Sequence, residues 1–393
     1  MMERVLIAGT VRTPMGRFGG TLKDFTAAQL GGLVGREALA RAGVEPGWVD
    51  QVVVANARQA GTGPNLGRQL VPRCGLPLEV PGYTVNMACG SGLKAVELAA
   101  AAVLLGSARC VLVVGVEAMS RIPYLLDEAR WGYRLGNSTL HDALYRDGFI
   151  CALTDQHMGM TAEKLARRYG LQRADADAYA VASHQKAVRA RSSGALASQI
   201  TPVSIPQRKG PALEWKEDEC PRLDTSLDQV ARLPPVFAGD GQVTAGNASA
   251  IADGAAALLV MAESFACEHS LQPGLEYLGE ASAGVDPDYM GIGSVPAVER
   301  LTRALGMAVT DFDAIEINEA FAVQVLACLM ELGLTPDDVN PNGGAVALGH
   351  PIGMTGVRLL VALDHHLTGP GRGLATMCVN GGMGLACAVR SLR

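Results

Sequence analysis

Apolar positions along this chain follow two patterns that alternate. One pattern has helical spacing and occurs at Leu30, Leu33, Val34, Ala38 and Leu39. The other is a short continuous apolar run, as in residues 110–114 and 374–378, which is typical of a buried strand. The most apolar stretch, residues 98–116, is broken by a glycine, a serine and an arginine. It therefore predicts a helix, a turn and a strand, not a membrane span. The alternation predicts an α/β layered fold with sheets buried between helices.

The pattern repeats itself at a nearly constant offset. Residues 43–54 and 306–317 share a glycine that stops a helix, followed by an aspartate that precedes a strand. Farther along, Ser91-Gly92 and Thr355-Gly356 each open an apolar helical segment, and the two glycines are 264 positions apart. Several matched segments in one register indicate a duplicated framework, with one helix–strand–loop–helix–strand unit in each half.

One long segment has no counterpart in the second half. Residues 119–244 contain proline-rich and charge-rich stretches and a clear amphipathic helix pattern over residues 176–190. We interpret this segment as an inserted loop domain. The predicted first half then comprises residues 1–118 and 245–268, and the second half comprises residues 269–393.

Composition narrows the class of protein. Nearly half of the 393 residues are hydrophobic, so a sizeable core is expected, and 47 glycines indicate tight turns and close packing. The net charge of −6 gives no reason to expect nucleic acid or an acidic membrane surface as a partner. Nine cysteines without C-x-x-C spacing argue against a disulfide framework and a zinc site. The apolar run at residues 5–9 is too short for a signal peptide. We expect reduced thiols and a cytoplasmic protein.

Two cysteines and one histidine stand in glycine-rich turns. Cys89 lies in N-M-A-C-G-S-G just before a helical segment, and Cys378 begins C-V-N-G-G-M-G after a strand pattern. His350 lies between them in G-G-A-V-A-L-G-H-P-I-G. A helix N-terminus favours the thiolate form of a cysteine, and an imidazole can complete an activated nucleophile. A second thiol can then serve as acid and base, so these residues suggest covalent acyl chemistry.

Other titratable residues have simpler interpretations. Five further cysteines lie in apolar runs and are predicted to be core residues: Cys110, Cys151, Cys267, Cys328 and Cys387. His365 and His366 are predicted to end a helix, where imidazoles interact favourably with the dipole. By themselves, His350 could cap a helix turn and Asn318 could end a strand through its side chain.

Four motifs in order resemble the thiolase family over essentially the whole chain: N-M-A-C-G-S-G, N-E-A-F at residues 318–321, the His350 segment and the Cys378 segment. The resemblance implies a duplicated α/β/α/β/α fold with an inserted loop domain, and Claisen chemistry on CoA thioesters. It implies that Cys89 becomes acylated, that His350 takes its proton, and that Cys378 moves the proton at the α-carbon. Asn318 would hold a water beside His350 in one oxyanion hole. The backbone N–H groups of Cys89 and Asn380 would form the other.

The resemblance also implies substrate contacts. His157 and Met158, in H-M-G-M-T-A-E, would line the acyl pocket as in thiolases that form acetoacetyl-CoA. Ala245 and Ser249 would contact the pantetheine arm, with Ser249 donating a hydrogen bond. Two further substrate residues are implied, Arg222 near the CoA nucleotide and Phe321 in N-E-A-F. Acyl-CoA and CoA are the expected ligands, with no metal or redox cofactor, in a homotetramer built as a dimer of dimers.

Two positions depart from the family pattern. Asn380 stands where many members have glycine, and asparagine is the best-tolerated alternative if that position needs a positive φ. Leu233-Pro234-Pro235 replaces the more usual L-R-P, which removes a positive charge near the expected CoA contacts.

Four alternatives remain beside the interconversion of two acetyl-CoA with acetoacetyl-CoA and CoA. The nearest is a thiolase for longer 3-ketoacyl-CoA substrates. A decarboxylating ketoacyl synthase would share the duplicated layers but resembles a Cys-His-His plan. A non-catalytic relative would be expected to lose a reactive group. An unrelated Cys-His hydrolase would leave Cys378 and the duplication unexplained.

Overall fold

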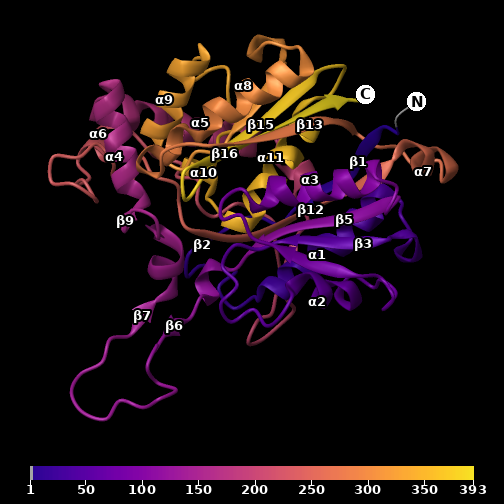
Figure 1. Ribbon diagram of the computed structural model, residues 1–393, viewed down its shortest axis with the longest axis horizontal. Helices are drawn as coiled ribbons and strands as arrows, with labels where there is room; N and C mark the ends of the chain where they lie inside the picture. The colour runs from indigo at the N-terminus through magenta and orange to yellow at the C-terminus, as the bar shows by residue number, and fades with distance from the viewer. Residues whose placement is uncertain (1–2) are drawn as a thin grey trace.

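The computed structural model describes residues 3–393, and it contains the predicted duplication (Figure 1). The first half supplies the strands β1 (Val5–Arg12), β3 (Gln51–Ala55), β4 (Gly82–Val85), β5 (Cys110–Glu117) and β12 (Ala252–Ala262). The second half supplies β13 (Leu275–Gly284), β14 (Ala314–Ile317), β15 (Arg372–Val379) and β16 (Met383–Ser391). These strands form one sheet in the order β14-β15-β16-β13-β1-β12-β5-β3-β4, with the short β2 (Gly16–Arg17) beside β12.

Each half of the sheet has parallel strands toward its outer edge and antiparallel strands toward the centre. Strand β3 is parallel to β4 and β5, and β14 is parallel to β15, whereas β12, β13 and β16 pair antiparallel to their neighbours. The halves join where β1 pairs with both β12 and β13. Both halves are therefore built on the same plan.

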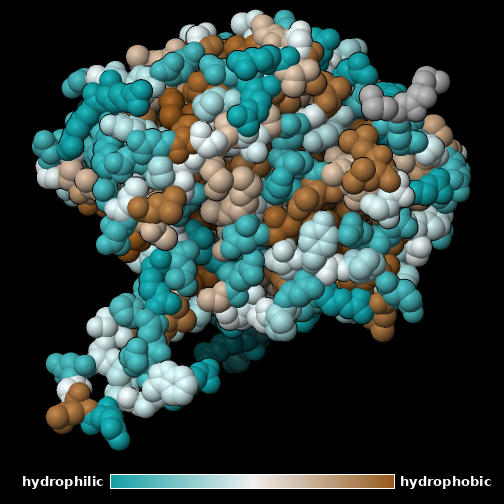
Figure 2. Space-filling model, in the orientation of Figure 1, coloured by the Kyte–Doolittle hydropathy of each residue, from teal (hydrophilic) through white to brown (hydrophobic). Residues whose placement is uncertain are grey.

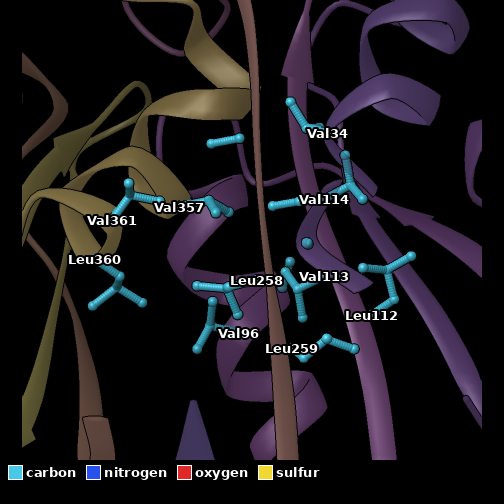
Figure 3. Close-up of a cluster of buried hydrophobic side chains, with 14 of the residues drawn as sticks. Val34, Val96, Leu112, Val113, Val114, Leu258, Leu259, Val357, Leu360 and Val361 are labelled. Carbon is cyan, nitrogen blue, oxygen red and sulfur yellow. The ribbon is translucent and has the colours of Figure 1, made fainter. Parts of the chain in front are cut away.

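Helices cover the two halves of the sheet in layers. The helices α1 (Ala27–Ala42) and α2 (Leu66–Arg73) pack on the first half, and α8 (Ser294–Leu305) packs on the second beside α9 (Ala322–Leu332). Between them lie α3 (Ser91–Leu104) and α11 (Ile352–His366), which contact each other and strands of both halves. Figure 3 shows part of the resulting core, in which side chains of β5 and β12 meet those of α1, α3 and α11. The predicted α/β/α/β/α layering is confirmed.

The two central helices cross at equivalent glycines of the two repeats. A Cβ atom on Gly92 would lie 2.7 Å from the Cα of Gly356, so the backbones can approach this closely only because neither residue has a side chain. Helix α11 begins at Ile352, three residues before the predicted start at Thr355, because Pro351 supplies the N-cap with φ −66°. This crossing brings the N-terminal ends of both helices together.

The segment 119–244 adds no strand to the large sheet within the described residues. Its strands pair only with each other: β6 (Tyr124–Leu125) with β7 (His141–Asp142), β8 (Ile150–Cys151) with β9 (Gln156–His157), and β10 (Val203–Ile205) with β11 (Leu213–Trp215). Its helices are α4 (Met158–Tyr169), α5 (Arg173–Ser192) and α6 (Leu227–Ala231). The helix predicted over residues 176–190 is confirmed as α5, but the expected amphipathic character is not, because the buried residues of α5 include the polar Asp177, Ser183 and His184. The exact boundaries of the inserted domain stay a prediction.

Several smaller elements complete the chain. The helices α7 (Glu263–Glu268) and α10 (Ala345–Leu348) are short. Short 3-10 or π-helical segments span Pro46–Trp48, Met119–Arg121, Tyr145–Phe149, Ala197–Gln199, Pro287–Gly293 and Val309–Asp311. Four of the five cysteines predicted in the core are buried, but Cys267 is exposed because α7 packs through Phe265 and Ala266 instead. His365 and His366 lie in the last turn of α11, as predicted. Among residues 3–393, no helix has both the length and the apolar character that crossing a membrane requires.

Candidate active site

Turns from both halves of the molecule meet at one cavity. Cys89 lies between β4 and α3, and His350 lies just before α11. Cys378 is the penultimate residue of β15. All three line a cavity of about 270 Å³, and Asn318, directly after β14, stands behind His350. Chain segments that are far apart in the sequence thus bring two thiols and one imidazole together.

The turn that carries Cys89 is held in an unusual backbone conformation. Ala88 has φ +45°, which non-glycine residues rarely adopt, and the hydroxyl of Ser91 donates to the Ala88 carbonyl at 2.6 Å. The backbone N–H of Met87 donates to the same hydroxyl at 2.8 Å. The turn presents the Cys89 thiol to the cavity, where it keeps partial access.

The electrostatics of Cys89 differ from the sequence expectation. Burial raises the pKa of the Cys89 thiol, and this outweighs the backbone N–H of Asn380 and the charge of Arg58, which act in the opposite direction. A helix N-terminus alone therefore does not hold this cysteine as a thiolate, because desolvation of the charged form is the larger effect. The free thiol is the resting form.

The imidazole of His350 is fixed in orientation and in tautomer. The Thr355 hydroxyl donates its single proton to the Pro351 carbonyl at 2.9 Å, so it accepts a hydrogen bond from His350 Nδ1, which lies 2.6 Å away. Nε2 is then unprotonated and is free to accept a proton. Burial, with the charges of Arg358 and Arg58, lowers the pKa of His350 to about 3, so the ring is neutral at pH 7.

Asn318 is placed to act next to this imidazole. Its Nδ2 atom lies 3.5 Å from His350 Nε2, and its backbone N–H donates to the Thr376 carbonyl at 2.9 Å. Its buried Oδ1 atom has no hydrogen-bond partner among the described residues. A buried acceptor of this kind is available to a further donor.

Cys378 is more deeply enclosed than Cys89. Burial raises its pKa well above the ordinary thiol value, and the neighbouring sulfur atoms of Cys89 and Cys328 add to the effect. Both thiols are therefore neutral in the resting site.

The turn after Cys378 corrects one expectation. The left-handed backbone conformations lie at Gly381, with φ +89°, and Gly382, with φ +81°, and not at Asn380. The asparagine is therefore not a substitute for a conformationally required glycine. Its side-chain Nδ2 donates to the Gly148 carbonyl at 3.1 Å, which joins this turn to the inserted segment.

The expected substrate residues divide into two groups. His157, Met158, Ala245, Ser249 and Phe321 all line the cavity together with Asn380. Arg222 is exposed and lies outside the cavity lining; its backbone N–H donates to His184. The loop that carries Ser249 is held by the N-E-A-F segment, because the Ser249 N–H donates to the Ala320 carbonyl at 3.0 Å.

The sequence did not reveal most of the apolar wall. Arg58, Met119, Tyr145, Phe149, Phe237 and Met290 also line the cavity. Aromatic rings follow one another along it, with centroid separations of 5.3 Å from Tyr145 to His157, 6.0 Å from His157 to Phe237 and 6.3 Å from Phe237 to Phe321. No periodic signal in the sequence marks these residues. Within residues 3–393, no group of three or more His, Cys, Asp or Glu side chains is arranged to hold a metal ion.

Comparison with known proteins identifies the family. The family model described as "Thiolase, N-terminal domain" matches residues 5–264, and that described as "Thiolase, C-terminal domain" matches residues 271–391. The chain belongs to the thiolase family. It is thus a thiolase-type acyltransferase, as the motifs around Cys89, His350 and Cys378 indicated.

Several individual proteins resemble this thiolase along its whole length. A probable acetyl-CoA acyltransferase of Staphylococcus aureus (strain COL) is 45% identical over 389 residues, which cover 99% of each chain. The solved acetyl-CoA acetyltransferase from Syntrophomonas wolfei is 39% identical, with a TM-score of 0.97 over 99% of this chain and 100% of that one. Human mitochondrial 3-ketoacyl-CoA thiolase in complex with CoA is 36% identical, with a TM-score of 0.95 over 100% of this chain and 99% of that one. The similar structures thus include both acetyl-CoA and 3-ketoacyl-CoA enzymes.

Proposed function

We propose that this thiolase interconverts two acetyl-CoA molecules with acetoacetyl-CoA and CoA by Claisen chemistry, through an acyl-Cys89 intermediate. The single observation that carries the proposal is the meeting of Cys89, Cys378 and His350 at one largely apolar cavity. The thioesters and CoA are substrates, and no step needs a metal or redox cofactor.

Acylation of Cys89 is the first step. His350 Nε2 takes the thiol proton as Cys89 Sγ attacks the thioester carbonyl, and CoA leaves as the C–S bond breaks. Thr355 supports this transfer because it keeps Nδ1 protonated and Nε2 free. The neutral resting groups transfer the proton within the substrate complex.

Carbon–carbon bond formation is the second step. Cys378 removes a proton from the α-carbon of the second acetyl-CoA, and the resulting enolate attacks the acyl carbon on Cys89. The bond to Cys89 Sγ breaks, acetoacetyl-CoA forms, and the Cys89 sulfur takes back its proton from His350. Cys378 gives the α-proton to the CoA thiolate that left in the first step. In the reverse direction, Cys378 returns the proton to the α-carbon as the carbon–carbon bond breaks.

Oxygen atoms that become negative in these steps need fixed donors. The N–H groups of Cys89 and Asn380 serve the acyl group on Cys89. The imidazole of His350 and a water held by Asn318 serve the thioester of the second substrate. The orphaned Oδ1 atom of Asn318 supports the water-holding role.

The remaining assignments concern CoA. Ala245 and Ser249 contact the pantetheine arm at the cavity, and Arg222 interacts near the nucleotide from the exposed surface. Pro234 stands where the family pattern L-R-P implies a positive charge, so Arg222 has less help in binding phosphate groups.

A second candidate substrate class is a longer 3-ketoacyl-CoA. The aromatic wall built from Tyr145, Phe149 and Phe237 favours it, because apolar side chains stabilise an alkyl chain. His157 and Met158 in the same wall are the residues that favour the acetoacetyl assignment.

We further propose a homotetramer, a dimer of dimers, that works in the cytoplasm. The segment between β6 and β7 projects from the body of the molecule and carries exposed apolar side chains, among them Trp131 and Leu135 (Figures 1 and 2). Apolar side chains on a projecting segment are typical of a contact between subunits. All nine cysteines are free, which fits a reducing compartment.

Two variants and one substrate series test the proposal. Mass spectrometry after incubation with acetyl-CoA should find the acetyl group on Cys89 in the wild type and in Cys378→Ala, but not in Cys89→Ala. Cys378→Ala should nevertheless fail to cleave acetoacetyl-CoA. An acetyl adduct that persists in a folded Cys89→Ala variant would refute the nucleophile assignment. CoA-dependent cleavage rates over 3-oxoacyl-CoA chain lengths then decide between the two substrate classes.

A further inference from the structure

The cavity wall contains one buried charge that the proposed steps do not use. Arg58 is only 6% exposed and lines the same cavity as Cys89, and its Nε atom has no hydrogen-bond partner in the described part of the chain. The other two buried arginines are paired: Arg12 with Asp218 at 2.6 Å and Arg358 with Glu316 at 2.8 Å. Arg58 forms no such ion pair within residues 3–393. Because an unpaired buried guanidinium is costly, this arrangement indicates a partner from outside the chain.

The carboxylate whose pKa the charge of Arg58 acts on is that of Glu117, and it is already hydrogen-bonded to other donors. Glu117 is buried, and its carboxylate accepts N–H groups from Asn56 Nδ2 at 2.6 Å, Ala57 at 3.0 Å, Arg58 at 3.0 Å and Gly353 at 2.9 Å. The Arg58 donor in this set is the backbone N–H and not the guanidinium. Glu117 thus holds two turns beside the cavity together, and it interacts with the Arg58 guanidinium through charge without a hydrogen bond between the two side chains.

Arg58 also lines a second cavity. This cavity has a volume of about 200 Å³, shares Arg58 with the Cys89 cavity, and is also lined by Arg73, Arg121 and the first residues of α1. No aspartate or glutamate is among its lining residues. Neither Arg73 nor Arg121 forms an ion pair in the described part of the chain. Three guanidinium groups and a helix N-terminus make this space favourable for an anion.

We propose that Arg58 and this second cavity bind a carboxylate at the far end of the acyl group. The substrate class is then the CoA thioesters of 3-oxo dicarboxylic acids. This inference rests on the proposed function, because the acyl group must be bonded to Cys89 for its far end to be held at Arg58. Arginine suits this role because its planar fork binds a carboxylate through two parallel charge-assisted hydrogen bonds.

The chemistry at Cys89 is unchanged for such a substrate. With 3-oxohexanedioyl-CoA, Cys89 Sγ bonds to C3 and the C2–C3 bond breaks. Its electron pair remains on C2, which Cys378 protonates, and acetyl-CoA leaves. A four-carbon acyl group with a terminal carboxylate stays on Cys89 until CoA removes it. The carboxylate takes no part in bond changes and serves only for recognition.

The test compares two six-carbon thioesters that differ only at the far end. The measurement is kcat/KM for CoA-dependent cleavage of 3-oxohexanedioyl-CoA and of 3-oxohexanoyl-CoA. The wild type should prefer the dicarboxylic substrate by roughly tenfold or more, because charged hydrogen bonds are individually strong. The ratio should fall by about 10²-fold in Arg58→Met and by less in Arg58→Lys, which keeps the charge but loses the fork. Arg208→Met, at an exposed loop position, serves as the matched control and should keep the wild-type ratio.

Each other outcome has a definite meaning. Equal losses for both thioesters in Arg58→Met would show that the charge acts on Cys89 and would overturn the subsite. Calorimetric binding of inorganic phosphate that depends on Arg58, without any preference between the thioesters, would identify a site for a free anion and would also overturn it. If Arg58→Met does not fold, the wild-type ratio and that of Arg58→Lys decide. Failure of both thioesters to acylate Cys89 in the wild type would instead refute the proposed function, and the subsite with it.

Discussion

Replacement of Thr355 by valine should disable His350 while the shape of the site is preserved. Valine replaces the hydroxyl with a methyl group of similar size. The variant then loses the acceptor at 2.6 Å from His350 Nδ1 and the donor at 2.9 Å from the Pro351 carbonyl. His350 is buried, so its Nδ1–H is left without a partner in a place that water does not readily reach.

The magnitude follows from the hydrogen bond that is lost. An unsatisfied buried donor costs about 1–3 kcal/mol, and each 1.4 kcal/mol corresponds to a factor of about ten. If the ring avoids this cost by moving its proton to Nε2, the nitrogen that accepts the Cys89 proton is blocked. We therefore expect the rate of Cys89 acylation to fall by about 10- to 10²-fold, with a loss of stability of about 1–3 kcal/mol. Thr355→Ser keeps the hydroxyl and should restore most of the rate.

The assay is the pre-steady-state release of CoA from acetyl-CoA, measured against pH. It isolates acylation from the later carbon–carbon step. The valine variant should lose amplitude or rate at every pH, whereas a purely structural role would lower stability without changing the acylation rate of the folded fraction. An acylation rate within about threefold of the wild type in Thr355→Val would refute the idea that this hydroxyl sets the tautomer.

Two further predictions concern the fold around the site. Gly92→Ala should destabilise the protein by at least about 1–3 kcal/mol in urea unfolding, because its Cβ would lie 2.7 Å from the Gly356 Cα. Gly47→Ala, which meets nothing within 4 Å, should stay within about 0.5 kcal/mol of the wild type, and equal losses in both variants would contradict the tight crossing. The folded-state pKa of His350 is lowered from 6.5 to about 3. Burial of the neutral ring therefore costs no unfolding free energy above pH 6.5. Below that pH the unfolded state binds the proton, and the unfolding free energy falls by about 1.4 kcal/mol per pH unit. Between pH 7.5 and 5.0 the wild type should therefore lose about 2 kcal/mol of unfolding free energy more than His350→Asn, and a pH-independent difference between the two would contradict the shift.

Local sequence patterns predicted the framework because the two repeats carry the same signals. Apolar runs and helix-ending glycines identified β5, β15, α1 and α8, and the offset between Gly92 and Gly356 matches the pair at which α3 and α11 cross. The start of α11 was placed three residues too late because the equivalent helix α3 has no proline before it. Repeats predict shared elements well, but they do not predict how each copy begins.

Residues of the candidate site stood out in the sequence where a glycine-rich turn marks them. Cys89, His350 and Cys378 stand in such turns, and they line one cavity. No sequence pattern marked Thr355 or Arg58 as residues of the site. The importance of Thr355 lies in its hydrogen bond to the His350 ring, and that of Arg58 lies in its lack of a paired carboxylate. Both properties depend on three-dimensional neighbours. The same applies to Cys267, whose apolar sequence context did not reveal that its short helix packs through other side chains.

The proximity of the two thiols gives the proposed reaction a fixed order. Two thiols that line one cavity cannot both ionise easily, and Cys89 is one of the groups that raise the pKa of Cys378. Acylation converts Cys89 into a neutral thioester that can no longer develop a negative charge. After acylation, Cys378 is the only one of the two thiols that can still lose its proton, so it serves as the base once the first substrate is bonded to Cys89. A site with one thiol and a permanent base would lack this dependence, and it could form an enolate before any acyl acceptor was present.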